Sequence, residues 1–84
     1  MHENQHTLFD LLVLSLGNAA LISLGLVADK DHTPAQKDLE SAKYHIELLE
    51  MLENKTRGNL IDSEKQILTD ILYDLRLKYV EARR

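Results

Sequence analysis

The sequence predicts a small all-α protein, and three observations support this fold class. With 84 residues, the chain has room for one domain built around one core. Leucine supplies 17 residues, whereas valine and glycine occur three times each and proline once, so helix formers outnumber strand formers. Apolar residues recur at intervals of three and four, as on one face of a helix. We therefore expect three helices arranged as a helical bundle.

The first helix is expected over residues 7–25, after a disordered N-terminus formed by residues 1–6. Thr7 offers a hydroxyl oxygen to unpaired backbone amides, and Asp10 places a carboxylate near the positive end of the helix dipole. Gly25 is suited to end this helix because glycine tolerates the left-handed conformation that often closes one.

The second helix is expected over residues 34–57. Thr33 can cap its start, Pro34 suits the first helical position, and Gln36 can complete a capping box. Gly58 then ends the helix. Its apolar stripe comprises Ala35, Leu39, Ala42, Ile46, Leu49 and Leu52.

The third helix is expected over residues 62–82, with Asp62 or Ser63 as the cap and Gln66 at the spacing of a capping box. Because the connection before it is short, we expect the second and third helices to form an antiparallel hairpin. Two apolar rows on this helix predict two neighbours. The main row is Ile67, Leu68, Ile71, Leu72, Leu75 and Tyr79, and the second is Tyr73, Leu77 and Val80.

The first third of the chain is nearly uncharged. Residues 1–28 carry only Glu3 and Asp10, and the other twelve acidic and all ten basic residues follow. The stripes of the other two helices each cover only part of a neighbour's circumference, so part of the first helix stays uncovered within one chain. We therefore expect a helical-bundle homo-oligomer, with a homodimer favoured, that buries this helix between chains.

Small residues mark the expected contact. Ser15, Ala19 and Ser23 recur at four-residue spacing and form a row along which a second helix backbone can approach closely. A two-fold contact centred near Ala19 fits this row. The alternative is that the row packs against another helix of the same chain. The candidate self-association residues are Leu12, Ser15, Leu16, Ala19, Ile22 and Ser23.

A membrane-associated protein is the alternative explanation for the apolar first helix. From Leu11 to Ala28 there are eighteen uncharged residues. As a helix these residues would extend roughly 27 Å, close to the thickness of a bilayer core. Lys30 is the only basic residue near either end, and no Trp or Tyr lies at a boundary, so the flanks are weak. In this alternative the helix is inserted in the bilayer or lies on it.

Enzymatic and metal chemistry find little support in the sequence. Cysteine is absent, which excludes disulfides, thiol catalysis and cysteine-ligated zinc. His2 and His6 are four residues apart but have no third ligand nearby, and His45 lacks a companion histidine or a Glu-x-x-His pair. Three glycines supply neither a phosphate-binding loop nor a nucleophile elbow. We therefore expect no catalytic residue, no metal, no cofactor and no enzymatic activity.

The charge balance bears on the choice of partner. The formal net charge of −4 is the wrong sign for binding nucleic acid through its phosphates, so no nucleic-acid partner is expected. A weaker alternative is an RNA-binding accessory protein that uses the basic residues 55–58 and the basic C-terminus. Helix faces without a catalytic cluster favour a non-enzymatic assembly or adaptor module that binds another protein.

The most distinctive segment is Lys55-Thr56-Arg57-Gly58-Asn59-Leu60, which predicts a basic helix end, a glycine stop and an apolar residue that folds inward. Together with four further motifs, it resembles a family of short bacterial proteins, the domain of unknown function 1844. The resemblance covers nearly the whole chain. The further motifs are Leu16-Gly17-Asn18-Ala19-Ala20, Leu24-Gly25, Leu48-Leu49-Glu50-Met51-Leu52 and Leu72-Tyr73-Asp74-Leu75-Arg76.

This resemblance implies a fold and a bacterial, cytoplasmic setting, but no activity. We interpret the distinctive residues as structural or as an interaction motif, with Asp74 and Arg76 pairing with Lys55, with Arg57 or with a neighbouring chain. The residues of this candidate motif are Lys55, Thr56, Arg57, Gly58, Asn59, Asp74 and Arg76.

Overall fold

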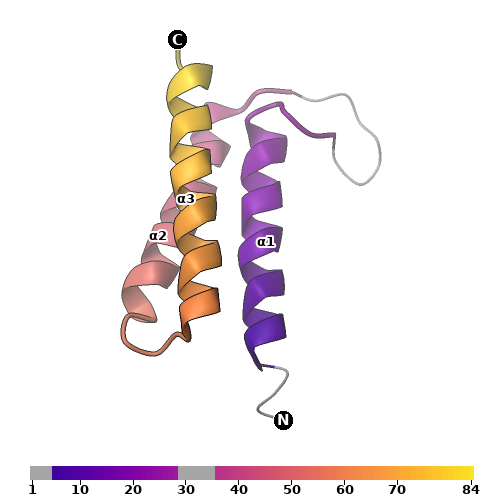
Figure 1. Ribbon diagram of the computed structural model, residues 1–84. Helices are drawn as coiled ribbons and strands as arrows, with labels where there is room; N and C mark the ends of the chain where they lie inside the picture. Colours follow the sequence, from indigo (N-terminus) through magenta and orange to yellow (C-terminus); the bar gives the residue numbers. More distant parts are fainter. Residues whose placement is uncertain (1–4, 29–35) are drawn as a thin grey trace.

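The computed structural model describes residues 5–28 and 36–84, which form three helices (Figure 1). They are α1 (Gln5–Ser23), α2 (Leu39–Lys55) and α3 (Asp62–Ala82). No strand occurs in these two ranges. Each helix contacts both of the others. The predicted all-α class with three helices is therefore confirmed.

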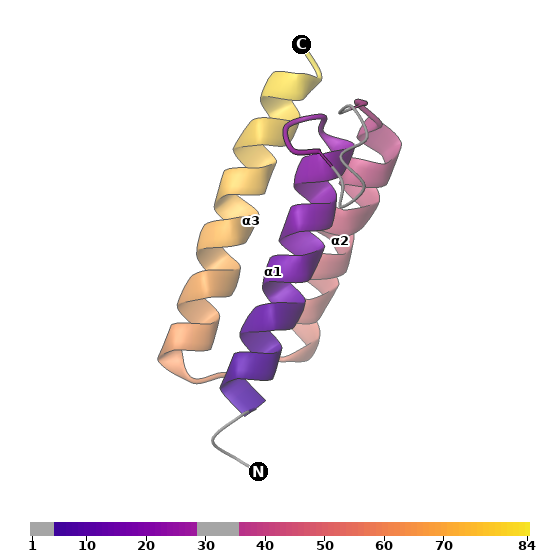
Figure 2. The ribbon, with the colours of Figure 1, turned by 90° about the vertical axis from the view of Figure 1, so that its right-hand side faces the viewer.

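The start of α1 and the turn between α2 and α3 lie at one end of the molecule, and the C-terminus lies at the other end (Figure 1). In the rotated view, α1 lies beside α3 and in front of α2 (Figure 2). One side of α1 therefore faces the other two helices, and its opposite side faces outward.

Helix α1 begins and ends two residues earlier than the sequence predicts. Gln5 and His6 already belong to the helix, so the predicted disordered segment 1–6 is too long; residues 1–4 lie outside the described ranges. At the other end, Gly25 has φ of +79°, and the backbone N–H of Leu26 donates to the carbonyl of Leu21 over 3.0 Å. These features are those of a left-handed helix stop, so the predicted role of Gly25 is confirmed.

The long uncharged stretch of the sequence is divided in the structure. It runs from Leu11 to Ala28, but α1 ends at Ser23, so it does not form one continuous helix. Over residues 5–28 and 36–84, we find no helix that combines the length and the hydrophobicity needed to cross a bilayer.

Helix α2 begins at Leu39, five residues after the predicted start at Pro34. Its cap is Asp38, whose carboxylate accepts a hydrogen bond from the backbone N–H of Ser41 at 3.1 Å. The backbone N–H of Asp38 also donates to the carbonyl of Ser23 at 2.6 Å, which joins the start of α2 to the end of α1. The prediction was wrong because this tertiary contact and the Asp38 carboxylate set the start. Two residues of the predicted capping motif, Thr33 and Pro34, lie outside the described ranges.

Helix α3 spans the predicted residues but is capped differently. Its N-cap is Ile61, whose backbone N–H donates to the Glu64 carboxylate at 3.0 Å. Asp62 and Ser63 lie inside the first turn, so their predicted capping role is wrong, and Glu64 takes the position expected for Gln66. Glu64 is only 8% exposed, and this hydrogen bond satisfies one of its carboxylate oxygens.

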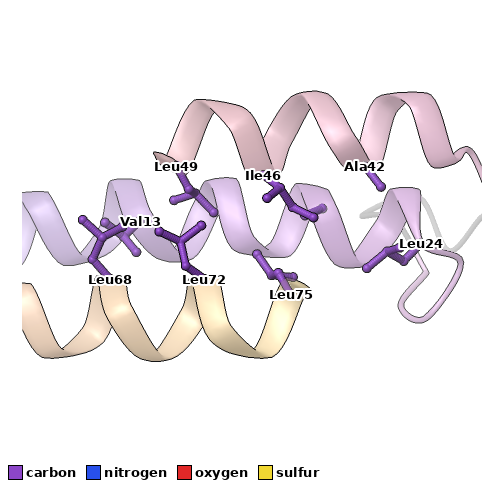
Figure 3. Packing of buried hydrophobic residues seen from close by; sticks show 9 residues of the cluster. Val13, Leu24, Ala42, Ile46, Leu49, Leu68, Leu72 and Leu75 are labelled. Carbon is purple, nitrogen blue, oxygen red and sulfur yellow. The ribbon is translucent and has the colours of Figure 1, made fainter. Parts of the chain in front are cut away.

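The core lies where the inner faces of the three helices meet (Figure 3). Leu49 from α2 and Leu72 from α3 point toward one another and are fully buried. The middle of each predicted stripe supplies the α2 and α3 part of the core, whereas Leu39, Leu52, Ile67, Ile71 and Tyr79 are only partly buried. Ala35 of the predicted α2 stripe lies outside the described residues. The buried apolar residues are Val13, Ala20, Leu24, Ala42, Ile46, Leu49, Leu68, Leu72 and Leu75.

Candidate protein-interaction surfaces

The side of α1 opposite the core is apolar and exposed. Leu8, Leu11 and Leu12 are 64%, 55% and 46% exposed. The only charged residue between residues 5 and 28 is Asp10, which is partly buried on the inner side of the helix. This side therefore presents no charged group to solvent. We call it the outer α1 face, and its residues are Leu8, Leu11, Leu12, Ser15, Ala19 and Ile22.

The structure separates the predicted self-association residues into two groups. Leu12 and Ser15 are exposed, and Ala19 and Ile22 are partly buried. The other two face their own chain. Leu16 packs against the core cluster. The hydroxyl of Ser23 donates to the carbonyl of Ala19 and lies 3.0 Å from the hydroxyl of Ser41 on α2. The small-residue row is therefore split: Ser15 and Ala19 belong to the outer α1 face, and Ser23 contacts α2.

Sequence reasoning missed three exposed leucines of α1. Leu8, Leu11 and Leu14 are all more exposed than Leu12, which was predicted. Leu8, Leu11 and Leu12 do follow a helical i, i+3, i+4 pattern. That pattern could not single them out, because apolar residues occupy almost every side of α1 and only packing decides which side is covered.

A second apolar feature is the groove between α1 and α3, which we call the α1–α3 groove. Its volume is about 420 Å³. Gly17 is buried here, and a Cβ atom at this position would lie 3.2 Å from Cγ2 of Ile71, so the absence of a side chain lets the helices approach closely. Among the described residues, Asp70 and Asp74 are the only charged ones that line it. The full lining is Leu14, Gly17, Asn18, Leu21, Asp70, Ile71, Asp74 and Leu75.

The predicted motif at residues 55–59 forms the turn between α2 and α3. The Thr56 hydroxyl donates to the carbonyl of Leu52 at 2.7 Å, and the backbone N–H of Asn59 donates to the carbonyl of Thr56 at 2.9 Å. Gly58 has φ of +84°, a left-handed conformation that glycine adopts without strain. Three of the five residues therefore shape the turn itself. The side chains of the other two, Lys55 and Arg57, are exposed.

The predicted pairing of Asp74 and Arg76 with the basic turn is wrong. Asp74 accepts from Lys78 on its own helix at 2.5 Å, and Arg76 donates to Glu50 of α2 at 2.8 Å. The physical reason is distance along the helix. Asp74 lies twelve residues beyond the first residue of α3, which corresponds to roughly 18 Å from the turn. Both observed pairs are exposed, so each contributes little to stability.

Possible catalytic and metal-binding groups are dispersed. Nδ1 of His45 lies 2.8 Å from the carbonyl of Ser41, and its ring meets that of Tyr44 edge-on at 5.7 Å. His45 is therefore held by its own helix. In the described part of the chain, no three His, Asp or Glu side chains gather in a way that could hold a metal ion. The side chain of His6, and all of His2 and His32, lie outside that part.

These features define a small three-helix protein that exposes an apolar helix face and an apolar groove with an acidic rim. A family profile described as Domain of unknown function (DUF1844) matches residues 6–81. The chain therefore belongs to this family, which confirms the resemblance seen in its motifs. No curated protein and no solved structure matches the chain.

Proposed function

We propose that this protein is a non-enzymatic assembly module of the bacterial cytoplasm. Its chains associate through the outer α1 face into a helical-bundle homo-oligomer, with a homodimer as the basic unit. In each chain α2 and α3 act as an antiparallel hairpin that supports α1 and leaves surface for a second protein. The observation that carries this proposal is the exposed, uncharged outer face of α1.

An apolar outer face is unusual for a surface helix. Such helices normally place charged and polar residues opposite the core. Contiguous exposed apolar surface marks an interaction site, and its burial stabilises a complex by about 25 cal/mol per Å². In a two-fold contact the outer α1 face meets itself, and because it carries no charge, no like charges are brought together. Ser15 and Ala19 lie within this face and allow two helices to approach closely.

The adaptor part of the proposal is supported by the surfaces that a contact through α1 leaves free. The exposed side of α2 carries both charge signs on Glu40, Lys43 and Glu47, and the α1–α3 groove lies beside the outer α1 face. The non-enzymatic part is supported by the ion pairs. The two that the structure describes are well exposed, although Asp74 also lines the α1–α3 groove, whereas catalytic groups gather in enclosed pockets. The absence of cysteine fits a reducing compartment.

The test is the absolute mass of the untagged protein by light scattering over a range of concentrations, without detergent. We expect a dimer, or a multiple of it. Leu12→Lys should reduce this mass to that of a monomer, because it places a charge in the outer α1 face. Leu77→Lys is the matched control, since Leu77 is 49% exposed and Leu12 is 46% exposed. A Leu12→Lys protein that keeps the wild-type mass would contradict assembly through this face.

A second candidate function is membrane association with α1 lying on the bilayer surface. The exposed leucines of the outer α1 face favour it. However, helices that lie in the interface usually add lysines or arginines that attract anionic lipids, and residues 5–28 contain none. Co-sedimentation with vesicles containing phosphatidylserine distinguishes the two functions. Assembly through α1 predicts that the oligomer stays in the supernatant, whereas membrane association predicts recovery with the vesicles.

A further inference from the structure

We propose that the α1–α3 groove binds an amphipathic helix of another protein. The apolar side of that helix enters the groove, and its lysine or arginine residues pair with Asp70 and Asp74. This inference rests on the adaptor role proposed above and specifies the chemistry of the partner.

The shape and lining of the groove suit a helix with an apolar side. Leu14 and Leu21 line it from α1, and Ile71 lines it from α3. Leu14 is 48% exposed, and Leu21 and Ile71 are partly buried, so all three have apolar surface still to cover. Gly17 lets Ile71 pack close to α1, because a Cβ there would lie 3.2 Å from Cγ2 of Ile71. An apolar groove between helices is a common docking site for an amphipathic helix, whose anchors recur at i, i+3, i+4 and i+7.

The charges on the groove are all of one sign and lie on one side. Asp70 and Asp74 are exposed on successive turns of α3, whereas α1 contributes no charged residue to the lining. Asp70 accepts a hydrogen bond from Gln66 at 2.8 Å, and Asp74 accepts one from Lys78. An ionised carboxylate has about four lone-pair positions, so both retain acceptor capacity. A partner with cations at one edge of its apolar side would therefore match this groove.

A second copy of the chain docked by α1 does not supply that chemistry. Residues 5–28 contain no basic residue, so self-association through the outer α1 face brings no further cation to Asp70 or to the Asp74–Lys78 pair. Two arginines of α3 are already engaged within the chain. Arg76 pairs with Glu50, and the guanidinium of Arg83 lies 5.6 Å from the centre of the Tyr79 ring. Assembly through the outer α1 face therefore leaves the aspartate side of the groove open to a different, basic partner.

The experiment measures binding of a fluorescein-labelled helical peptide to the full chain by fluorescence anisotropy. The probe has about 18 residues, with leucines on one side and lysines on the other, and its counterpart has glutamate at each lysine position. We expect the lysine peptide to bind at least about tenfold more tightly than the glutamate peptide, and more weakly as salt is raised.

Two double variants with equal net charge localise the binding. Asp70→Asn with Asp74→Asn should weaken binding of the lysine peptide about tenfold. Glu40→Gln with Glu47→Gln removes two exposed charges from α2, and should change binding by less than about twofold. Asp70→Lys with Asp74→Lys should reverse the preference toward the glutamate peptide, which a variant that simply unfolds cannot do.

Three results would overturn the inference. The first is equal affinity for the lysine and glutamate peptides. The second is an equal loss of affinity for the lysine peptide in the groove variant and the α2 variant. The third is a change of oligomeric mass in the Asp70 and Asp74 variants, which would place a second copy of the chain in the groove. The proposed function is tested separately. If the wild-type protein assembles but does not bind the lysine peptide, the proposed self-association stands and the proposed groove partner is refuted. If it is a monomer that binds the lysine peptide, the groove partner stands and the self-association is refuted.

Discussion

Helices α1 and α2 are alike on their inner sides and different on their outer sides. Each supplies fully buried residues to the common core, Val13 and Ala20 from α1 and Ala42 and Leu49 from α2. The outer side of α2 carries charged residues of both signs, whereas that of α1 carries leucines and no charge. The inner sides therefore account for the fold, and the two helices differ in that the outer side of α1 exposes apolar surface without charge.

Exposed apolar residues also occur on α2, but they do not form a comparable surface. Tyr44 and Met51 are exposed among charged neighbours such as Lys43 and Glu47. Scattered apolar residues of this kind are normal on soluble proteins. The difference lies in continuity: on α1 nothing charged interrupts the apolar surface.

The largest expected effect contrasts the inner side of α2 with the outer side of α1. Leu49→Ala should lower the free energy of unfolding by about 2–5 kcal/mol, because Leu49 is fully buried and the change leaves a cavity. Leu12→Ala should cost less than about 1 kcal/mol in the monomer, since Leu12 is half exposed. Urea denaturation at several protein concentrations checks this, because the Leu12 effect should grow where the protein assembles. Equal costs at the lowest concentration would contradict the contrast.

The next effect compares the glycines that follow α1 and α2. Gly25 and Gly58 both have positive φ, which costs a residue with a side chain about 1–2 kcal/mol. Gly25→Ala should be the more harmful change. A Cβ there would lie at ordinary contact distance, 3.4 Å, from the backbone nitrogen of Lys37, and the nearby Asp38–Ser23 hydrogen bond keeps the turn from shifting to relieve the positive φ. Gly58 has open space around it and can relax. Thermal unfolding of both variants measures the difference, and a more harmful Gly58→Ala would refute this ranking.

A smaller effect concerns the start of α2. Asp38→Ala should lower stability by about 1 kcal/mol, because it removes the side chain that caps the helix at the Ser41 backbone N–H. Asp38→Asn preserves an oxygen acceptor and should cost much less. Chemical denaturation of the two variants provides the measurement. Equal losses in both would mean that the negative charge, rather than the hydrogen bond, is responsible.

The smallest expected effect concerns the polar contact between α2 and α3. Arg76→Ala should change stability by about 0.5 kcal/mol or less, because Arg76 and Glu50 are both well exposed. A double-mutant cycle with Glu50→Ala isolates the interaction of the pair. A coupling above about 1 kcal/mol would show that the outer side of α2 contributes to the fold more than its exposure suggests.

Much of the fold could be predicted because helical periodicity is a local property. The stripes containing Ile46 and Leu72 were identified by their spacing, and both residues are buried in the structure. The start of α2 was not predictable, because Asp38 is fixed by a backbone hydrogen bond to Ser23, a partner distant in the sequence. The partner of Arg76 was missed for the same reason, since Glu50 lies on another helix. Asp74 differs, because its partner Lys78 is only four residues away on the same helix, a spacing that the sequence displays.

The candidate surfaces were less predictable than the core. Sequence alone indicated that α1 needs more cover than one chain offers, but almost every side of this helix is apolar. Ser23 illustrates the ambiguity, since its spacing suited self-association and the structure instead places it against Ser41. The α1–α3 groove had no sequence signature, because Gly17 and Asp70 are 53 positions apart and meet only through packing.

Composition and periodicity were enough to establish an all-α chain with a nearly uncharged first helix, because both depend on residues close together in the sequence. Tertiary packing decided which leucines of α1 remain exposed, where α2 begins, and which charges face one another. Those properties depend on which side of each helix packs against the other two helices. Once α2 and α3 cover the inner side of α1, its outer side and the acidic-rimmed groove are left open to other chains.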